Sequence, residues 1–88
     1  MMHHVQWTLK AAKQAKKIPL PERGRIVESV GSLKDWPEAM QANDIKRLKN
    51  HRYQYRMRVG RYRVLFDVES GLKVVSIEEV RKRDECTY

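Results

Sequence analysis

The residues best suited to chemistry in this sequence lie between positions 46 and 63. This stretch holds eight lysine and arginine side chains and no aspartate or glutamate. Six of the eight are arginines, and a guanidinium group can bind a phosphate through two parallel hydrogen bonds, which an ammonium group cannot do. The stretch therefore predicts a site for a polyanion, with nucleic acid as the first candidate. The eight residues are Lys46, Arg47, Lys49, Arg52, Arg56, Arg58, Arg61 and Arg63.

Alternation of polar and apolar residues predicts that this stretch forms an antiparallel hairpin with Val59-Gly60 as a two-residue loop. In this register Arg58 faces Arg61 and Arg56 faces Arg63, so four guanidinium groups share one face of the sheet. Like charges directly opposite one another destabilise a sheet, and a bound polyanion would remove that cost. The other face would carry the pairs Tyr55–Val64 and Tyr53–Phe66.

Two other interpretations of the arginines stay open. They could form a solvated face with no ligand, because runs of charge on a strand often do no more than face water. A slip of one residue in the hairpin register would also place each arginine opposite an apolar neighbour. The acids available to balance a solvated face are Asp67, Glu78 and Glu79.

A second basic cluster lies at the C-terminal end, where Arg81, Lys82 and Arg83 follow the last apolar run. In a meander of strands the end of the last strand lies beside the middle of its neighbour, which would bring Arg83 near Arg63. The final residue, Tyr88, could stack on a base, move a proton, or be a frayed terminal aromatic.

Other reactive side chains give weaker signals. His51 lies at the edge of the basic stretch and could act as an acid or a base, although the sequence names no partner for it. Cys86 has no recognisable cysteine–histidine arrangement, so we assign it no catalytic role. Solvated positions are predicted for Lys10, Lys13 and Lys17, and core positions for Trp7 and Trp36.

Composition excludes several classes of protein. A chain of 88 residues with 41% hydrophobic content supports one domain, spanning 1–88. Nineteen Lys and Arg against eleven Asp and Glu give a net charge of +8, which favours anionic partners. With no apolar run long enough to span a membrane, no signal peptide and a single cysteine, we expect a cytoplasmic protein without a membrane partner. One cysteine and three histidines also make a metal site unexpected.

The elements that must position the basic residues follow from periodicity and from capping and turn signals. Ile26, Val30 and Leu33, with Val27 beside them, form one apolar helical stripe. Helices followed by strands predict an α+β fold, with a helical hairpin packed on one face of a small, mainly antiparallel sheet. The expected order is a strand within 1–8, a helix over 9–17 capped by Thr8, a proline elbow over 18–21, a helix over 21–34, a loop over 35–44, and strands over 45–48, 52–59, 61–68 and 73–80.

This order of elements, together with the segments Leu48–Tyr53 and Arg56–Phe66, resembles the RelE/ParE toxin superfamily over essentially the whole chain. Members commonly read L-K-G and then R-L-R-V-G-D-Y-R-V-I-Y at these positions. They end in a basic K/H-R segment and a tyrosine, as Lys82-Arg83 and Tyr88 do here. The resemblance implies the RelE-like fold and a toxin of a bacterial type II toxin–antitoxin module, of the kind that stabilises plasmids.

The resemblance also implies two possible targets. RelE-like members enter the ribosomal A site and cut mRNA, whereas ParE-like members share the fold and inhibit DNA gyrase. By position, Arg63 matches the sheet arginine that contacts the scissile phosphate, and Arg56 matches a basic residue of the preceding strand. Arg83 matches the arginine at the end of the last strand, and Tyr88 matches the C-terminal tyrosine. Retention of all four favours the mRNA-cutting branch and makes them the predicted catalytic residues.

Two departures leave the general base unidentified. Gln54 stands where a RelE-like member carries lysine, and the spacing from Arg83 to Tyr88 is one residue shorter than in that member. Lys49, His51 and Tyr88 all remain candidates for proton transfer. The residues predicted to bind RNA around the catalytic set are Lys46, Arg47, Lys49, His51, Arg52, Arg58, Arg61, Arg81 and Lys82.

The chemistry implied by the resemblance is a ribosome-dependent endoribonuclease that inhibits translation. The 2′-hydroxyl of the RNA attacks the adjacent phosphate, and arginines stabilise the added charge, so neither a metal nor a small-molecule cofactor is expected. The implied partners are the ribosome, mRNA and a cognate antitoxin with an acidic toxin-binding segment. The alternatives are a ParE-like gyrase inhibitor and a non-toxic, basic nucleic-acid-binding module.

Overall fold

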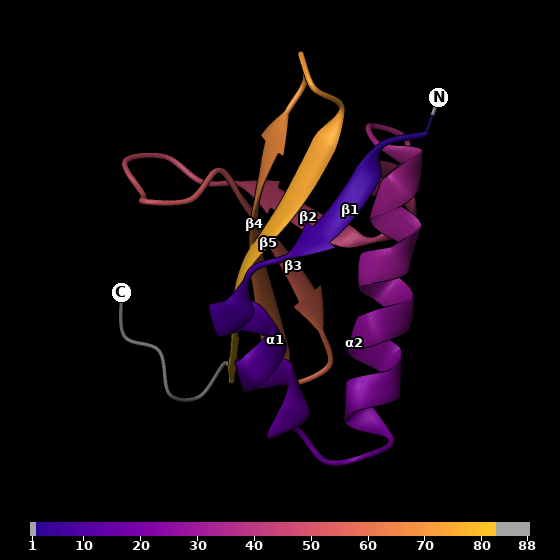
Figure 1. The fold of residues 1–88 in the computed structure, drawn as a ribbon, viewed down its shortest axis with the longest axis vertical. Coiled ribbons are helices and arrows are strands. Elements are labelled where there is room, and N and C mark those ends of the chain that lie inside the picture. The colour runs from indigo at the N-terminus through magenta and orange to yellow at the C-terminus, as the bar shows by residue number, and fades with distance from the viewer. Residues whose placement is uncertain (1, 83–88) are drawn as a thin grey trace.

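A computed structural model describes residues 2–82 as helices packed on a five-stranded sheet, which confirms the predicted α+β fold (Figure 1). The strand order is β1-β5-β4-β3-β2, with β1 and β5 parallel and the remaining neighbours antiparallel. Arg83, Cys86 and Tyr88 lie outside the described residues. The elements are β1 (His4–Trp7), α1 (Leu9–Lys16), α2 (Glu22–Gly31), the 3₁₀ helix η1 (Ser32–Asp35), α3 (Ala39–Ala42), β2 (Asp44–Arg47), β3 (Tyr55–Val59), β4 (Tyr62–Glu69) and β5 (Val74–Lys82).

Thr8 starts α1, as its residue type predicts. Its Oγ1 accepts a hydrogen bond from the Ala11 amide at 3.1 Å, which satisfies one of the free N–H groups of the first turn. The same hydroxyl donates to the Ile77 carbonyl oxygen at 2.9 Å. One side chain therefore caps the helix and fixes its beginning against β5.

The second helix is shorter than the predicted 21–34. Regular helix ends at Gly31 and the chain tightens into η1, where Leu33 stays buried in line with Ile26 and Val30. The predicted apolar stripe is confirmed for these three residues, but Val27 is 51% exposed and lies outside it. One position along the helix turns a side chain by about 100°, which is enough to move Val27 off the buried face.

The segment predicted as a loop over 35–44 contains a further turn of helix, α3. Asn43 stabilises this turn through its Nδ2, which donates to the Ala39 carbonyl oxygen at 2.9 Å and to Ser32 Oγ at 3.0 Å. Trp36, predicted to be core, is buried with its ring edge-on to Tyr55 and Phe66, at centroid distances of 4.8 and 5.6 Å. The aromatic contacts hold this crossing against the sheet.

The hydrophobic core lies between the helices and one face of the sheet. Its fully buried sheet residues include Met57, Val64, Phe66 and Ile77, and Ile26 reaches them from α2. Residues at alternate positions of the same strands therefore lie on the other face of the sheet. That second face carries the basic residues of β3 and β4.

The register of the β3–β4 hairpin differs from the prediction. The turn is Gly60-Arg61, because Val59 pairs with Tyr62 in the ladder and packs against the core. Gly60 has φ +58°, which glycine adopts without the steric cost that a β-branched residue would meet there. The predicted pairs are therefore wrong by two positions, and the true pairs are Arg58–Arg63, Arg56–Leu65, Met57–Val64 and Tyr55–Phe66.

A β-bulge in the pairing of β4 with β5 decides which acidic residue joins the basic face. Leu65 pairs with Glu79, but the next residue, Phe66, pairs with Ile77, so Glu78 is the extra residue. An unbroken register would place Glu78 opposite the buried Phe66 in the core. The bulge puts Ile77 there instead and leaves Glu79 on the face opposite the core.

Candidate nucleic-acid interface

The sheet face opposite the core presents two rows of side chains across four strands, which we call the arginine face. One row runs Lys46–Arg56–Leu65–Glu79 and the other runs Asp44–Arg58–Arg63–Arg81, each from β2 through β3 and β4 to β5. In the second row Arg63 lies between Arg58 and Arg81, directly opposite both in the ladder. Arg58 and Arg81 thus flank Arg63, whereas Arg56, predicted to face it, lies in the other row. The predicted approach of Arg83 to Arg63 lies outside the described residues.

A cavity of about 420 Å³ opens on this face, and we call it the basic cavity. Its walls come from β2, β3, β4 and the segment that joins β2 to β3, which projects away from the sheet in Figure 1. It collects six residues of the predicted catalytic and RNA-binding set. The lining residues are Lys46, Leu48, Lys49, Asn50, His51, Arg56, Arg58 and Arg63.

An acid on the edge strand organises two of these arginines. Asp44 lies opposite Arg58 in the ladder, and its carboxylate contacts Arg56 at 3.4 Å and Arg58 at 3.9 Å. Arg56 is only 8% exposed. Because a buried cation needs a partner, Asp44 lowers the cost of keeping Arg56 in the wall of the basic cavity.

Glu79 is the second acid of the arginine face, and it is 3% exposed. Its carboxylate accepts hydrogen bonds from the Tyr53 hydroxyl at 2.8 Å and from Arg81 Nε at 2.7 Å, and it lies 3.3 Å from Lys10 Nζ. Burial acts to raise the pKa of Glu79, but these three partners outweigh it and lower the pKa to about 2. Burial and the Glu79 carboxylate together raise the pKa of Tyr53. Glu79 is therefore an anion set into the basic face.

Of the acids proposed to balance the arginines, only Glu79 pairs with a basic side chain of this face among the described residues. The Asp67 carboxylate instead accepts a hydrogen bond from the backbone amide of Gln54 at 2.8 Å, and the Glu78 carboxylate accepts one from the Ser76 hydroxyl at 2.7 Å. Gln54 Oε1 in turn accepts from the Val68 amide at 2.8 Å. Gln54, which stands where a RelE-like member carries lysine, thus ties the start of β3 to β4.

Several predicted RNA-binding residues do not line the basic cavity. Arg47 donates to the Tyr55 hydroxyl at 3.2 Å, and its guanidinium lies 5.6 Å from that ring. Arg61 is exposed in the hairpin turn, and Arg52 lies over the Tyr53 ring at 5.4 Å. Arg81 and Lys82 line a separate cavity, and Arg83 and Tyr88 fall outside the described residues.

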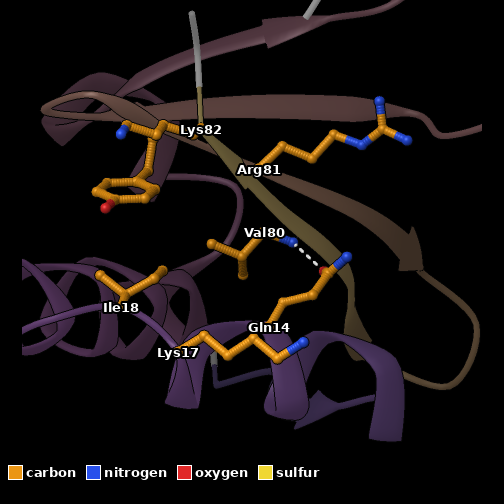
Figure 2. Close-up of a pocket in the computed structure, with 7 residues that line it drawn as sticks. Gln14, Lys17, Ile18, Val80, Arg81 and Lys82 are labelled. Carbon is orange, nitrogen blue, oxygen red and sulfur yellow. Dashed lines mark hydrogen bonds between the residues drawn. The ribbon is translucent and has the colours of Figure 1, made fainter. Parts of the chain in front are cut away.

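This second cavity, of about 510 Å³, lies between the end of α1 and the end of β5 (Figure 2). Gln14 Oε1 accepts from the Val80 amide at 2.7 Å and joins the two elements. Lys17 and Lys82 lie at its border, with Ile18 as an apolar wall. Lys13 and Lys17 are exposed as predicted, whereas Lys10 is an ion-pair partner of Glu79 rather than a merely solvated side chain.

Sequence reasoning missed Tyr53 and Asp44 as parts of the site, and it considered Glu79 only as an acid that could balance a solvated face. Positions 75, 77 and 79 share one parity, so a regular strand would place Glu79 on the core side with Val75 and Ile77. The bulge instead places Glu79 on the opposite face of the sheet, with the arginines. Tyr53 was expected beside Phe66 in the core, but the chain has not yet entered β3 there and its hydroxyl reaches Glu79.

Within residues 2–82, no group of three or more His, Cys, Asp or Glu side chains is arranged to hold a metal ion. In the same range, no helix has the length and apolar character needed to cross a membrane.

Comparison with known proteins supplies independent information. Residues 5–85 match the family model described as the ParE toxin of type II toxin–antitoxin systems, parDE. A curated protein of Methanocaldococcus jannaschii, named as a RelE1 toxin, is 29% identical over 84 residues, which are 96% of this chain and 93% of that protein.

Solved structures give the same fold. The RelE–RelB complex of Pyrococcus horikoshii OT3 superposes with a TM-score of 0.81 at 25% identity, covering 98% of this chain and 100% of the matched chain. The isolated RelE toxin of E. coli superposes with a TM-score of 0.73 at 20% identity, covering 91% of this chain and 83% of the toxin. The likeness to the second structure concerns the fold alone.

Proposed function

The chain belongs to the ParE toxin family of type II toxin–antitoxin systems, and we propose that it is a RelE-like toxin that cuts mRNA on the ribosome. The proposal rests on the arginine face. Membership of this family reduces the number of polyanion classes that the face is expected to bind.

The observation that carries the proposal is the position of Arg63. It lines the basic cavity with Arg56 and Arg58, and it lies between two other arginines in its row of the sheet. A simple electrostatic adhesion surface does not need three guanidinium groups in one row, because like charges side by side in a sheet cost stability. A phosphate that takes on extra negative charge during a reaction repays that cost.

The reaction follows from the chemistry of RNA. The 2′-hydroxyl oxygen attacks the adjacent phosphorus, the bond to the 5′-oxygen of the next nucleotide breaks, and a 2′,3′-cyclic phosphate remains. The proton of the 2′-hydroxyl leaves and the 5′-oxygen gains one. Arg63 and Arg56 stabilise the charge on the phosphate oxygens, and Lys46, Lys49 and Arg58 hold the flanking backbone.

The proposal includes a cognate antitoxin. Structural relatives are solved as complexes of RelE with RelB, and a toxin that cuts mRNA must be neutralised in the cell that makes it. We expect an acidic segment of that partner to cover the arginine face. Co-purification at low salt with the neighbouring gene product would test this, and recovery of the toxin alone would contradict it.

The test of function is induced expression followed by mapping of mRNA 5′ ends. We expect growth arrest with cuts in translated transcripts that follow the reading frame. Arg63→Ala should lower cleavage by at least a hundredfold, because it removes a charged donor to the reacting phosphate. The matched control is Arg25→Ala, an exposed arginine on α2, which should cut at the wild-type rate.

The family model is named for ParE, which gives the second candidate, a gyrase inhibitor, its support. This candidate makes a different prediction in the same experiment. Growth arrest with intact transcripts and with inhibited DNA supercoiling would establish it and refute the nuclease. Tolerated overexpression with neither effect would refute both and favour a non-toxic basic module.

A further inference from the structure

The segment between β2 and β3 is closed on itself by one hydrogen bond and is fastened to the rest of the molecule at two points, one on β4 and one on β5. The Leu48 amide donates to the Gln54 carbonyl oxygen at 2.8 Å and closes the segment on itself. Gln54 ties its end to β4 through Asp67 and the Val68 amide. The Tyr53 hydroxyl ties it to Glu79 on β5. The segment therefore has a fixed position over the arginine face.

Glu79 is a strong anchor for this segment. A carboxylate that stays ionised accepts a shorter and stronger hydrogen bond from a phenol than a neutral acid does. Arg81 at Oε1 and Lys10 at Oε2 keep Glu79 in that form. Tyr53 is itself only 8% exposed, so its hydroxyl depends on this single acceptor among the bonds described for it.

The backbone of the same tyrosine holds His51. The Tyr53 amide donates to His51 Nδ1 at 3.1 Å, two residues back along the chain, in the way an aspartate or asparagine closes an Asx turn. Only a neutral ring can make this bond, because an imidazolium carries hydrogen on both nitrogens. With Nδ1 as the acceptor, the neutral ring carries its hydrogen on Nε2.

Resting on the proposed function, we propose that His51 is a neutral hydrogen-bond donor to a phosphate oxygen of the bound RNA, and that Tyr53 and Glu79 are its positioning residues. His51 lines the basic cavity together with Lys46 and Lys49 of β2 and its following segment, and with Arg56, Arg58 and Arg63 of β3 and β4. A neutral donor adds no positive charge beside these cationic neighbours, which would repel a further cation.

The proposal also removes His51 from the candidates for the general base. A base needs a lone pair on the nitrogen that meets the 2′-hydroxyl. In this arrangement Nε2 carries hydrogen, and moving that hydrogen to Nδ1 would break the bond from the Tyr53 amide. His51 thus contributes to binding and orientation and not to proton transfer.

The test uses steady-state cleavage of mRNA on programmed ribosomes by the full-length toxin across a range of pH. His51→Asn keeps an acceptor for the Tyr53 amide and removes the ring. We expect it to raise KM about tenfold, the effect of losing one hydrogen bond to a charged group, with an unchanged shape of the pH profile of kcat. Loss of a limb of that profile between pH 5 and 8 would make His51 a proton-transfer group and overturn the proposal.

The positioning residues need their own variants. Tyr53→Phe removes only the hydroxyl, and we expect KM to rise about fivefold with kcat nearly unchanged. Glu79→Gln tests the other member of this pair, and its control is Glu28→Gln, which makes the same charge change at an exposed position of α2 and should match the wild type. Wild-type KM in Tyr53→Phe would show that this pair positions nothing that binds RNA.

Nitrogen NMR of the histidine ring provides a readout that does not depend on cleavage. At pH 7.5 we expect His51 in the wild type to be neutral with hydrogen on Nε2, and Tyr53→Phe to show a mixture of tautomers. A cationic ring, or hydrogen on Nδ1, would overturn the inference even if the toxin cuts mRNA. A wild type that leaves mRNA uncut would refute the proposed function, and the NMR spectrum would still decide the state of His51.

Discussion

At the scale of single residues, the site is defined by how its charges are paired. Asp44 lies at the β2 end of its row and contacts Arg56 and Arg58. Glu79 lies at the β5 end of the other row and contacts Arg81. These acids do not cancel the basic character of the surface. They fix the directions of Arg56, Arg58 and Arg81 around the position of Arg63, which lies at the centre of its row.

Glu79 gives a residue-scale prediction about acid stability. Its pKa of about 2 in the folded protein lies below the 4.5 of an exposed glutamate, so the ionised form stabilises the fold above pH 4.5. That contribution should disappear as the pH falls from 4.5 to 2. Because Lys10 and Arg81 are half-exposed and their interactions are screened by solvent, we expect about 2 kcal/mol rather than the full amount implied by the shift.

Urea unfolding of the wild type and Glu79→Gln at several pH values measures this contribution. The variant should be less stable by about 2 kcal/mol at pH 7, with the difference shrinking toward pH 2. Glu28→Gln, at an exposed position of α2, supplies the control and should follow the wild type at every pH. A difference that is the same at pH 7 and pH 2 would mean that the charge of Glu79 has no role in stability.

At the scale of elements, the hairpin turn and the β5 bulge decide the composition of the site. The turn at Gly60-Arg61 places Arg58 opposite Arg63, and the bulge at Glu78 places Glu79 and Arg81 on the same face. Each feature changes which side chains are neighbours without changing which residues are in strands. The turn and the bulge therefore turn a generic basic hairpin into this particular arrangement of arginines.

At the scale of elements, replacing either of two glycines by alanine should change the stability of the protein, in opposite directions. Gly60 has φ +58° in the turn, and a Cβ there would meet no atom within 4 Å. The cost of Gly60→Ala is therefore conformational, about 1 kcal/mol. Gly24 lies in α2 with equally open space, so Gly24→Ala should stabilise the protein by about 0.5–1 kcal/mol.

Thermal unfolding of the two variants and the wild type checks this pair. Both substitutions add one methyl group, so a difference of sign isolates backbone conformation from packing. A Gly60→Ala variant as stable as the wild type would contradict the left-handed turn, and with it the Arg58–Arg63 register.

At the scale of the whole molecule, the net charge of +8 is distributed unevenly. The helices cover one face of the sheet and form the core with it, while the opposite face gathers the arginines around the basic cavity. A surface of this kind attracts nucleic acid strongly and in a salt-dependent manner. The same asymmetry gives a partner with an acidic segment one face to cover.

Salt dependence is the prediction that belongs to this scale. If about five cations of the basic cavity contact phosphates, the logarithm of the affinity for a short single-stranded RNA should fall with the logarithm of salt concentration with a slope of roughly −3.5. Arg63→Ala should reduce the slope by about 0.7, whereas Arg25→Ala should leave it unchanged. Fluorescence anisotropy with labelled RNA measures both, and equal slopes in all three proteins would contradict a localised site.

The sequence alone determined the fold class, the order of most elements, the helix cap at Thr8, and the fact that Arg56, Arg58 and Arg63 share one face of a sheet. These follow from short-range periodicity and capping, which neighbouring residues specify. The tertiary structure decided the rest: the Gly60-Arg61 turn, the α3 turn, and the hydrogen bond from the Tyr53 hydroxyl to Glu79. The bulge that carries Glu79 and Arg81 onto the arginine face arises because Ile77, and not Glu78, must fill the core opposite Phe66. Such choices depend on the free energy of packing between distant strands, and local pattern does not record it.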